Sequence, residues 1–320
     1  MIITDNGVSQ IARAIEEGLS QKPKRLPSWL FYDETGDKLF QSIMEMPEYY
    51  LTRCEYEILE SNKDVLQRLF TDRSQSFNLI ELGAGDGLKT EILLKHFSKN
   101  NARFVYTPID VSASVLKALK ERVLRTIPDL VIEPNINRYE DALEALGHSE
   151  LTKIFLFLGA NIGNFTTGDA RNFVTRLSAF MNTDDQLLIG FDLKKDPRLI
   201  HAAYDDLHGT TRDFNLNLLV RLNRELGADF ETENFQHYPY YNPETGQNRS
   251  YLVSKMKQDV YLESVKKVFH FDEWEAIHTE VSQKYDARMI NKLASEAGLE
   301  IVKFFYDQKA YFCDVLLRKS

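Results

Sequence analysis

Hydrophobic and polar positions divide the chain into segments of different periodicity. Near the N-terminus, apolar residues recur at helical spacing and predict an amphipathic helix over residues 6–22, and a longer helix is predicted over 51–70. From Phe77 onward, short apolar runs alternate with helical segments. The predicted strands cover residues 77–83, 104–110, 130–134, 153–159 and 186–193. Such alternation is typical of a parallel, doubly wound sheet with helices on both faces.

This alternation stops at Pro197. Residues 197–245 are predicted to be helical and then loop-like, with the Tyr/Pro/Asn cluster 238–243 in the loop. The later predicted elements are strands at 249–254, 258–262 and 265–271, a helix near 286–298 that ends at Gly298, and strands at 299–306 and 310–317. The last two strands suit the antiparallel end of the first sheet. We therefore predict an α/β fold, a Rossmann-like doubly wound sheet with an inserted α+β segment.

The first predicted strand of the sheet runs directly into a glycine-rich turn. Glu81 is followed by Gly83, Gly85 and Gly87, and a helix is predicted to begin just after them. Glycine is needed in such a turn because a side chain would keep the backbone from closing around a nucleoside. This E-x-G-x-G-x-G arrangement is similar to the turn of S-adenosylmethionine-dependent methyltransferases. The nicotinamide fingerprint G-x-G-x-x-G would require glycine where Leu88 stands.

A second acid stands at the carboxyl end of the next predicted strand. Asp110 ends the run that begins at Phe104. An acid at this position can accept hydrogen bonds from both ribose hydroxyls of a bound nucleoside. The alternative is a tight structural turn followed by an ordinary aspartate at a strand end. The interval between the glycines and Asp110 favours nucleoside binding.

Composition and charge narrow the possible partners. Among the 320 residues, 43% are hydrophobic and 27% charged, and the formal net charge is -9. The chain has no long basic run, so we expect no nucleic-acid partner, since phosphate binding needs clustered Lys and Arg.

The cysteines give no sign of a metal site. Cys54 and Cys313 have neither the spacing of zinc ligands nor the number needed for a disulfide framework, so no metal is expected. The sequence shows no apolar core of a signal peptide. It also shows no apolar stretch as long as the ~20 residues needed to cross a bilayer, so we expect a cytoplasmic protein without membrane association.

Asn164 stands in a polar, glycine-spaced loop after the fourth predicted strand. Ligands of such sheets bind beyond the carboxyl ends of the strands. A carboxamide at this place can donate to a carboxylate and accept from an amine. The alternative is that Asn164 caps the helix predicted to begin near Thr166.

Further polar and aromatic residues are candidates for ligand binding. Tyr32 and Tyr49 lie in short aromatic segments, where core packing is the alternative. Tyr204 lies on a predicted helix of the inserted segment. Glu280 and Ser282 alternate, so on a strand they would face the same side and could bind a polar heterocycle. The alternative for this pair is a solvated strand face.

Together these segments resemble the histidine-specific Nα-methyltransferases, which form the trimethyl betaine hercynine on the route to ergothioneine. The resemblance runs essentially end to end. Its most specific segments are 31–33, 47–53 with Glu55, 81–90, 157–164, 202–206 and 279–282. Related members methylate tryptophan derivatives in fungal alkaloid pathways, among them the dimethylallyltryptophan N-methyltransferases.

The resemblance implies S-adenosylmethionine as cofactor and S-adenosylhomocysteine as product. The cofactor-binding positions that it implies are Tyr49, Gly83, Gly85, Lys89, Asp110, Arg138 and Tyr139. Tyr49 is expected to close over the amino-acid end of the cofactor. Arg138 and Tyr139 depart from the family, which usually has an acid in contact with the adenine amino group, followed by an aromatic residue.

The resemblance also implies a set of substrate contacts. Asn164 and Tyr204 match residues that bind the amino and carboxylate groups, and we expect them to be the catalytic residues. Tyr32, Glu280 and Ser282 match residues that bind the imidazole. A further substrate-binding position, Ser250, departs from the family, which has a methionine there, so this part of the pocket is smaller and more polar.

The implied architecture is a class I methyltransferase domain over residues 60–196 and 286–320, with a substrate-binding domain over 1–59 and 197–285. The implied reaction converts L-histidine to hercynine by successive SN2 methyl transfers. We expect a monomer with a small amino-acid substrate. One alternative is an N-methyltransferase of another aromatic amino acid, a tryptophan derivative or a modified histidine. The other is a non-catalytic S-adenosylmethionine-binding relative.

Overall fold

The computed structural model describes residues 5–72, 74–137, 142–143 and 151–319, with the side chains of 5–10 left aside. The chain forms two compact units. The sheet unit comprises Leu51–Lys194 and Lys284–Ser320, and the insert unit comprises Met1–Tyr50 and Lys195–Gln283. Within the described ranges, no helix offers an apolar stretch long enough to cross a bilayer.

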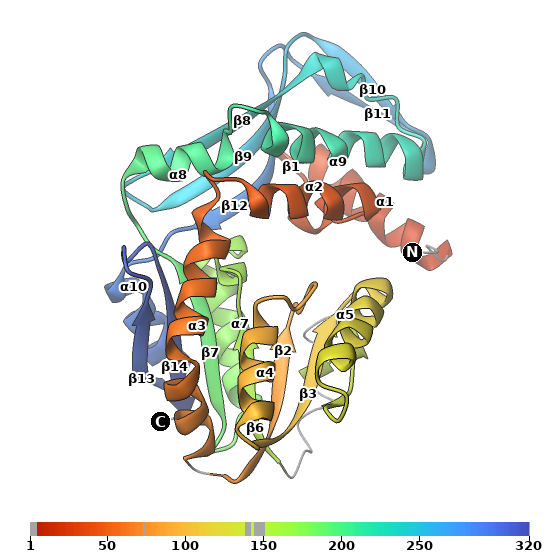
Figure 1. The fold of residues 1–320 in the computed structure, drawn as a ribbon. Coiled ribbons are helices and arrows are strands. Elements are labelled where there is room, and N and C mark those ends of the chain that lie inside the picture. The colour runs from red at the N-terminus through yellow and green to blue at the C-terminus, as the bar shows by residue number, and fades with distance from the viewer. Residues whose placement is uncertain (1–4, 73, 138–141, 144–150, 320) are drawn as a thin grey trace. The chain divides into compact units, whose positions relative to one another are not determined.

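The sheet unit contains one large mixed sheet flanked by helices (Figure 1). Its helices are α3 (Tyr50–Thr71), α4 (Thr90–Lys99), α5 (Ala113–Thr126), the 3₁₀ turn η2 (Asn161–Asn164), α7 (Thr167–Phe180) and α10 (Ala287–Glu296). Its strands are β2 (Ser76–Leu82), β3 (Arg103–Asp110), β4 (Val131–Ile132), β5 (Asn135–Ile136), β6 (Thr152–Phe157), β7 (Gln186–Asp192), β13 (Leu299–Tyr306) and β14 (Phe312–Lys319). The order is β13-β14-β7-β6-β2-β3-β4, and β5 also pairs with β3.

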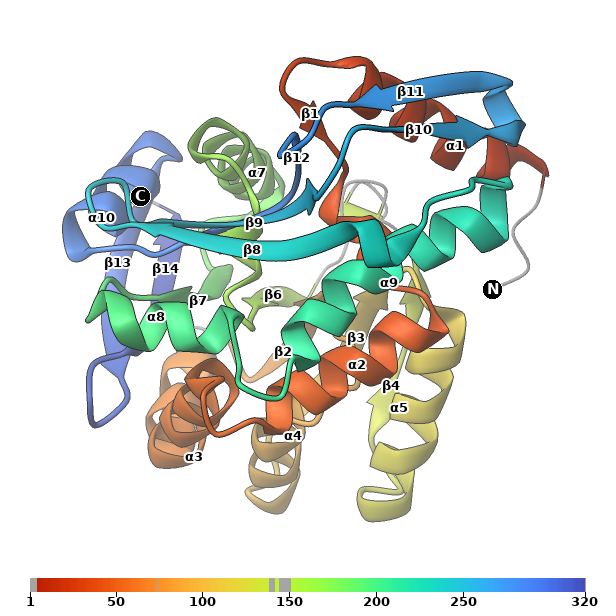
Figure 2. The same cartoon turned by 90° about the horizontal axis from the view of Figure 1, so that it is seen from above.

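Strand directions in this sheet confirm the predicted doubly wound fold. β6, β2 and β3 are parallel neighbours, and β7 extends them in the same direction. β14 pairs antiparallel with β7 and β13, as predicted for the end of the chain. In Figure 2, α3, α4 and α5 lie along one face of the sheet, while α7 and α10 lie along the other. With both faces of the sheet covered, the central strands are rich in apolar residues, and every residue of β7 is buried.

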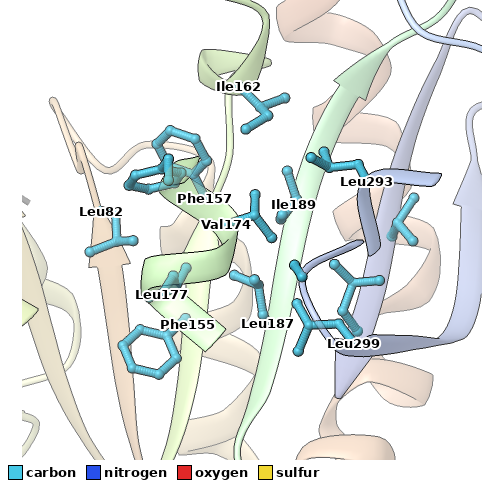
Figure 3. Packing of buried hydrophobic residues seen from close by; sticks show 14 of the residues in the cluster. Leu82, Phe155, Phe157, Ile162, Val174, Leu177, Leu187, Ile189, Leu293 and Leu299 are labelled. Atoms are coloured by element: carbon cyan, nitrogen blue, oxygen red, sulfur yellow. The ribbon is translucent and has the colours of Figure 1, made fainter. Parts of the chain in front are cut away.

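The core between the sheet and the helices α7 and α10 is closely packed, as Figure 3 shows. Phe155 and Phe157 of β6 and Leu187 and Ile189 of β7 alternate with residues of the opposite face and point toward α7. Their side chains are fully buried. Burial of this kind contributes roughly 1.5–3 kcal/mol per large apolar side chain, so the sheet unit has the rigid support that a site at its strand ends requires.

Two sequence predictions need correction in this unit. Of the strand predicted over 130–134, only β4 at 131–132 forms, and a second short strand, β5, follows at 135–136; each pairs with β3. The predicted domain boundary after residue 59 falls inside α3, which is continuous, so residues 51–59 belong to the sheet unit. A helix without a break cannot change units at its middle, because its backbone hydrogen bonds continue through that point.

The insert unit is built on a four-stranded sheet and a two-stranded hairpin. Its helical elements are α1 (Asp5–Ser20), η1 (Ser28–Phe31), α2 (Glu34–Glu45), α8 (Pro197–Tyr204), α9 (Thr210–Leu226), η3 (Thr232–Asn234) and η4 (Glu263–Val265). Its strands are β1 (Lys24–Arg25), β8 (Phe235–Asn242), β9 (Gln247–Ser254), β10 (Gln258–Leu262), β11 (Lys267–Phe271) and β12 (Ala276–Gln283). The larger sheet has the order β1-β12-β9-β8. Helix α9 packs against α2 and β8 and is central to the apolar core of this unit.

The Tyr/Pro/Asn cluster at 238–243 forms most of strand β8, so the predicted loop was wrong. Pro239 is compatible with a strand here because β8 is the edge strand of its sheet. At an edge, a missing N–H can leave the ladder intact. Phe235 and Pro239 are buried on the face that β8 shares with the core, as expected for alternation with a period of two.

Candidate active site

The glycine turn between β2 and α4 adopts a backbone that side chains would disfavour. Gly85 has φ +53°, and a Cβ added there would meet no atom within 4 Å. At Gly87, with φ +65°, an added Cβ would lie 2.5 Å from Leu119 Cδ1. Glycine at 87 therefore permits close packing on α5, whereas glycine at 85 leaves open space beside the turn.

Asp110 connects this turn to the end of β3. Its Oδ2 accepts the N–H of Gly85 at 3.0 Å, and its Oδ1 accepts the N–H of Ser112 at 3.0 Å. These two contacts fix the orientation of the carboxylate. Because an ionised carboxylate has about four lone-pair sites, two backbone donors leave acceptor capacity for the hydroxyls of a ligand.

Glu81 has a structural part in the turn. It is buried and accepts hydrogen bonds from the Thr90 hydroxyl at 2.6 Å and from the Tyr106 hydroxyl. Burial raises the pKa of the Glu81 carboxyl to about 7, against the opposing effect of the two hydroxyl donors. Glu81 thus joins β2 to α4 and β3 from inside the sheet unit, beneath the glycine turn.

Lys89 is paired with a buried acid. Its ammonium forms an ion pair with Glu55, whose carboxylate also accepts the N–H of Gly159 at 2.7 Å. Burial by itself would lower the pKa of Lys89, but the charge and hydrogen bond of Glu55, together with the charges of Glu81 and Asp314, outweigh it and the pKa is raised. Lys89 is therefore a fixed cation next to the loop after β6, where an added Cβ on Gly159 would lie 3.3 Å from its Nζ.

Asn164 ends the short turn η2 and is exposed to solvent. The hydroxyl of Thr166, and not the Asn164 side chain, caps α7 by accepting the N–H of Asp169 at 3.2 Å. The alternative role of Asn164 as a helix cap is therefore wrong. Tyr285 supports the turn by donating to the carbonyl of Ile162 at 3.2 Å.

These features of the sheet unit fit S-adenosylmethionine. Asp110 has acceptor capacity for ribose hydroxyls, Gly85 leaves space at the turn, and Lys89 places a positive charge at the neighbouring loop. All three lie at or after the carboxyl ends of parallel strands, where ligands of such sheets bind. Arg138 and Tyr139 lie outside the described residues.

In the insert unit, four polar side chains share one face of the sheet. Glu280 of β12 is opposite Ser250 of β9, and Ser282 is opposite Asn248. Opposed residues of an antiparallel pair point to the same face. We call these four residues the polar face. A register shift between His278 and Glu280 separates them from the preceding part of β12.

Tyr204, at the end of α8, contacts the polar face directly. Its hydroxyl donates to Ser282 Oγ at 2.8 Å, and both side chains are buried. The carbonyl of Tyr204 lies 2.9 Å from Nε2 of His237 on β8. Burial lowers the pKa of His237, so its ring is neutral at pH 7 and donates Nε2–H to this carbonyl. His237, which sequence reasoning missed, therefore positions the end of α8.

Two members of the polar face have no partner within the described part of the chain. Ser250 and Asn248 are each 1% exposed. The Ser250 hydroxyl and both polar atoms of the Asn248 amide form no hydrogen bond with the described residues. Sequence reasoning missed Asn248 because the predicted strand began at 249, one residue too late to include it.

The predicted aromatic residues of the insert unit pack together. The Tyr32 ring lies 5.7 Å from the Phe40 ring and 5.9 Å from that of Phe214, both in edge-on geometry. Tyr49 contacts the same Phe40 ring at 6.3 Å. Tyr32 remains 41% exposed, so packing fixes its ring without enclosing it.

The predicted site residues thus gather in two places. Tyr204, Ser250, Glu280 and Ser282 are neighbours in the insert unit. Gly83, Gly85, Lys89, Asp110 and Asn164 belong to the sheet unit. The individual ligand-binding roles of these residues stay predictions.

Comparison with known proteins gives a consistent result. Residues 11–319 match the family described as "Histidine-specific methyltransferase, SAM-dependent". A histidine N-alpha-methyltransferase from Mycobacterium tuberculosis is 34% identical over 308 residues, which span 96% of this chain and 94% of that protein. Another protein of that name, from Mycolicibacterium smegmatis, is 31% identical over 97% of this chain and 95% of its own. Ergothioneine biosynthesis protein 1 from Schizosaccharomyces pombe is 28% identical over 95% of this chain and 40% of its own.

The sheet order, the glycine turn and the position of Asp110 at the end of β3 agree with this match. The resemblance inferred from the sequence is confirmed. The protein is an enzyme with S-adenosylmethionine as cofactor, and the chain belongs to the family of histidine-specific, S-adenosylmethionine-dependent methyltransferases.

Proposed function

We propose that this methyltransferase converts L-histidine to Nα,Nα,Nα-trimethylhistidine (hercynine) by three successive transfers to the α-amino nitrogen. The observation that supports this substrate best is the contact of Tyr204 with Ser282 on the face that also contains Glu280. A phenol, a hydroxyl and a carboxylate together suit an amino acid with a polar ring. The named activity of the mycobacterial relatives agrees with this proposal.

Bound S-adenosylmethionine supplies an electrophilic methyl group on a sulfonium. Attack on it requires a neutral amine in line with the methyl, so positioning is the main contribution of the protein. Tyr204 donates its own proton to Ser282, and its phenolic oxygen therefore keeps lone pairs that can accept from an ammonium. We propose that Tyr204 and Asn164 orient the amino and carboxylate groups, and that a water bound by them accepts the proton.

Glu280 is proposed to select the ring. An ionised carboxylate opposite an imidazole N–H forms a charge-assisted hydrogen bond. A plain indole would offer one N–H at a different place and no acceptor nitrogen, so part of the polar face would stay unpaired. Sites built in this way discriminate strongly against analogues that lack the polar group.

The two units are proposed to divide these tasks. The sheet unit would bind the cofactor through Gly83, Gly85, Lys89 and Asp110, and Tyr49 is proposed as a further cofactor-binding residue. The polar face and Tyr32 would bind the substrate ring. The enzyme is further proposed to act as a monomer on a free amino acid and not on nucleic acid.

The direct test is S-adenosylhomocysteine production with histidine, tryptophan and ring-modified histidines as candidate substrates, followed by mass spectrometry of the methylated product. We expect the highest kcat/KM for histidine and a product that carries three methyl groups on the α-nitrogen.

Other outcomes would favour the alternatives. A higher kcat/KM for tryptophan or a modified histidine would support an N-methyltransferase of another aromatic amino acid. Absence of turnover with every amino acid, despite cofactor binding, would indicate a non-catalytic relative. A product methylated on the ring would overturn the proposed position of attack.

A further inference from the structure

Asn248 of β9 is a buried polar residue of the insert unit. Its side chain is buried, and neither the amide nitrogen nor the amide oxygen has a hydrogen-bond partner among the described residues. It points to the same face as Ser282, which lies directly opposite on β12. Ser250, two residues later on the same face, also has a buried hydroxyl without a partner.

A second buried asparagine of the insert unit has a partner for each of its two amide atoms. Asn215 of α9, also 1% exposed, donates to the carbonyl of Thr211 at 3.0 Å and accepts from the Thr279 hydroxyl at 3.2 Å. Buried polar groups in native proteins are normally satisfied in this way, because an unpaired one loses its hydration without compensation. Asn248 thus departs from the rule at a place where predicted substrate residues surround it.

We propose that Asn248 is a specificity-determining residue that donates a hydrogen bond to the substrate ring, with Ser250 as a second donor. This inference rests on the proposed function, and it adds strand β9 to the elements that recognise the ring. The substrate class is an aromatic ring with one N–H and one bare nitrogen, as in a neutral imidazole.

The chemistry of the polar face supports this assignment. Glu280, when ionised, can only accept, so it pairs with the ring N–H. The second nitrogen of a neutral imidazole has a lone pair and needs a donor. Ser282 accepts the proton of Tyr204 and, like any hydroxyl, also carries one donor of its own. Asn248 and Ser250 both present N–H or O–H donors on the same face, and such a division of acceptor and donor between two strands fits an imidazole and not an indole.

The test compares Asn248→Leu with Asn215→Leu as the matched control. Removing an unpaired amide should leave Tm unchanged or raise it, whereas removing the paired amide of Asn215 should lower Tm. We expect Asn248→Leu to raise KM for histidine by roughly tenfold or more, with kcat within about threefold of wild type. The Kd for S-adenosylmethionine should not change. Asn248→Ser, which keeps a donor, should recover part of the lost affinity.

In a folded Asn248→Leu variant, a kcat/KM for histidine within about twofold of wild type would overturn the proposal. If Asn248→Leu does not fold, the same kinetic comparison is made with Asn248→Ser and Asn248→Ala, where a graded loss supports the proposal and equal activity refutes it. Failure of the proposed function itself would be visible separately, as a lack of histidine turnover by the wild-type enzyme.

Discussion

The hydroxyl of Tyr204 lies 2.8 Å from the hydroxyl of Ser282, although 78 positions separate the two residues in sequence. The contact joins the C-terminal end of α8 to β12 and brings two predicted substrate residues together. His237 fixes the same helix end, because its Nε2 lies 2.9 Å from the backbone carbonyl oxygen of Tyr204. Three elements therefore determine where the Tyr204 oxygen lies, which is the kind of support that a positioning group for catalysis requires.

Replacement of Tyr204 by Phe should test this relationship. The change removes the hydrogen bond to Ser282 and the oxygen proposed to accept from the amine. We expect kcat/KM for histidine to fall by roughly 10- to 100-fold, about 1.4–3 kcal/mol, with kcat reduced more than KM is raised. Tyr238→Phe is the control, since Tyr238 is 52% exposed on the edge strand β8. Steady-state kinetics of both variants measure the effect, and equal values for the two would contradict the role of Tyr204.

Asp110 should determine cofactor affinity. Asp110→Ala removes the acceptors proposed for the ribose hydroxyls, and we expect binding of S-adenosylmethionine to weaken by roughly 1–3 kcal/mol in calorimetry. Asp110→Asn keeps one acceptor oxygen and should have a smaller effect. Because the carboxylate also accepts the N–H groups of Gly85 and Ser112, Tm is measured alongside. Normal cofactor affinity in the alanine variant would show that the assignment is wrong.

Glu81 should make stability depend on pH. Its pKa is about 7 in the folded protein, against an ordinary value of 4.5. Between these values the folded state binds more protons than the unfolded state, so stability decreases as pH rises through this window. The shift corresponds to at most about 3 kcal/mol. Urea unfolding from pH 4 to 8 measures the free energy of unfolding of wild type and of Glu81→Gln. This free energy should decline less with rising pH in the variant, by about the same amount. Parallel curves would mean that Glu81 keeps an ordinary pKa.

Much of the sheet unit was predictable because its signals are local. In the run Phe77–Leu82 four of the six residues are apolar, which favours a strand covered on both faces. The glycines that follow mark a turn with positive φ at their own positions. Asp110 could be placed because it ends a strand, and the geometry of parallel sheets then brings strand ends together.

Other features depend on partners far away in sequence. The ion pair between Lys89 and Glu55 joins residues 34 positions apart, and no local pattern indicates it. Pro239 suggested a loop, because proline is rare inside a sheet. It is compatible with a strand here only because β8 lies at the edge of its sheet, which the local sequence does not reveal. Asn248 became notable only when the fold showed that its amide is buried without a partner. For Pro239, tertiary context overrode a local preference, and for the other two features local sequence carried no signal.

Glu280 provides the sharpest test of substrate choice. On the polar face Glu280 is opposite Ser250, so the proposed substrate ring would meet a hydroxyl beside the carboxylate. Glu280→Ala should lower kcat/KM for histidine by roughly two orders of magnitude, about 3 kcal/mol, because the ring N–H loses a charge-assisted acceptor. For tryptophan the decrease in kcat/KM should be much smaller, or kcat/KM should rise. The indole offers the Glu280 carboxylate no ring partner, and the alanine variant removes the energetic cost of this mismatch. Glu280→Gln, which keeps the shape and one acceptor, is the matched control and should show an intermediate loss for histidine. The decisive measurement is kcat/KM for both amino acids with wild type and both variants. Equal proportional losses for the two substrates would show that Glu280 supports the fold or the transfer step and does not select the ring.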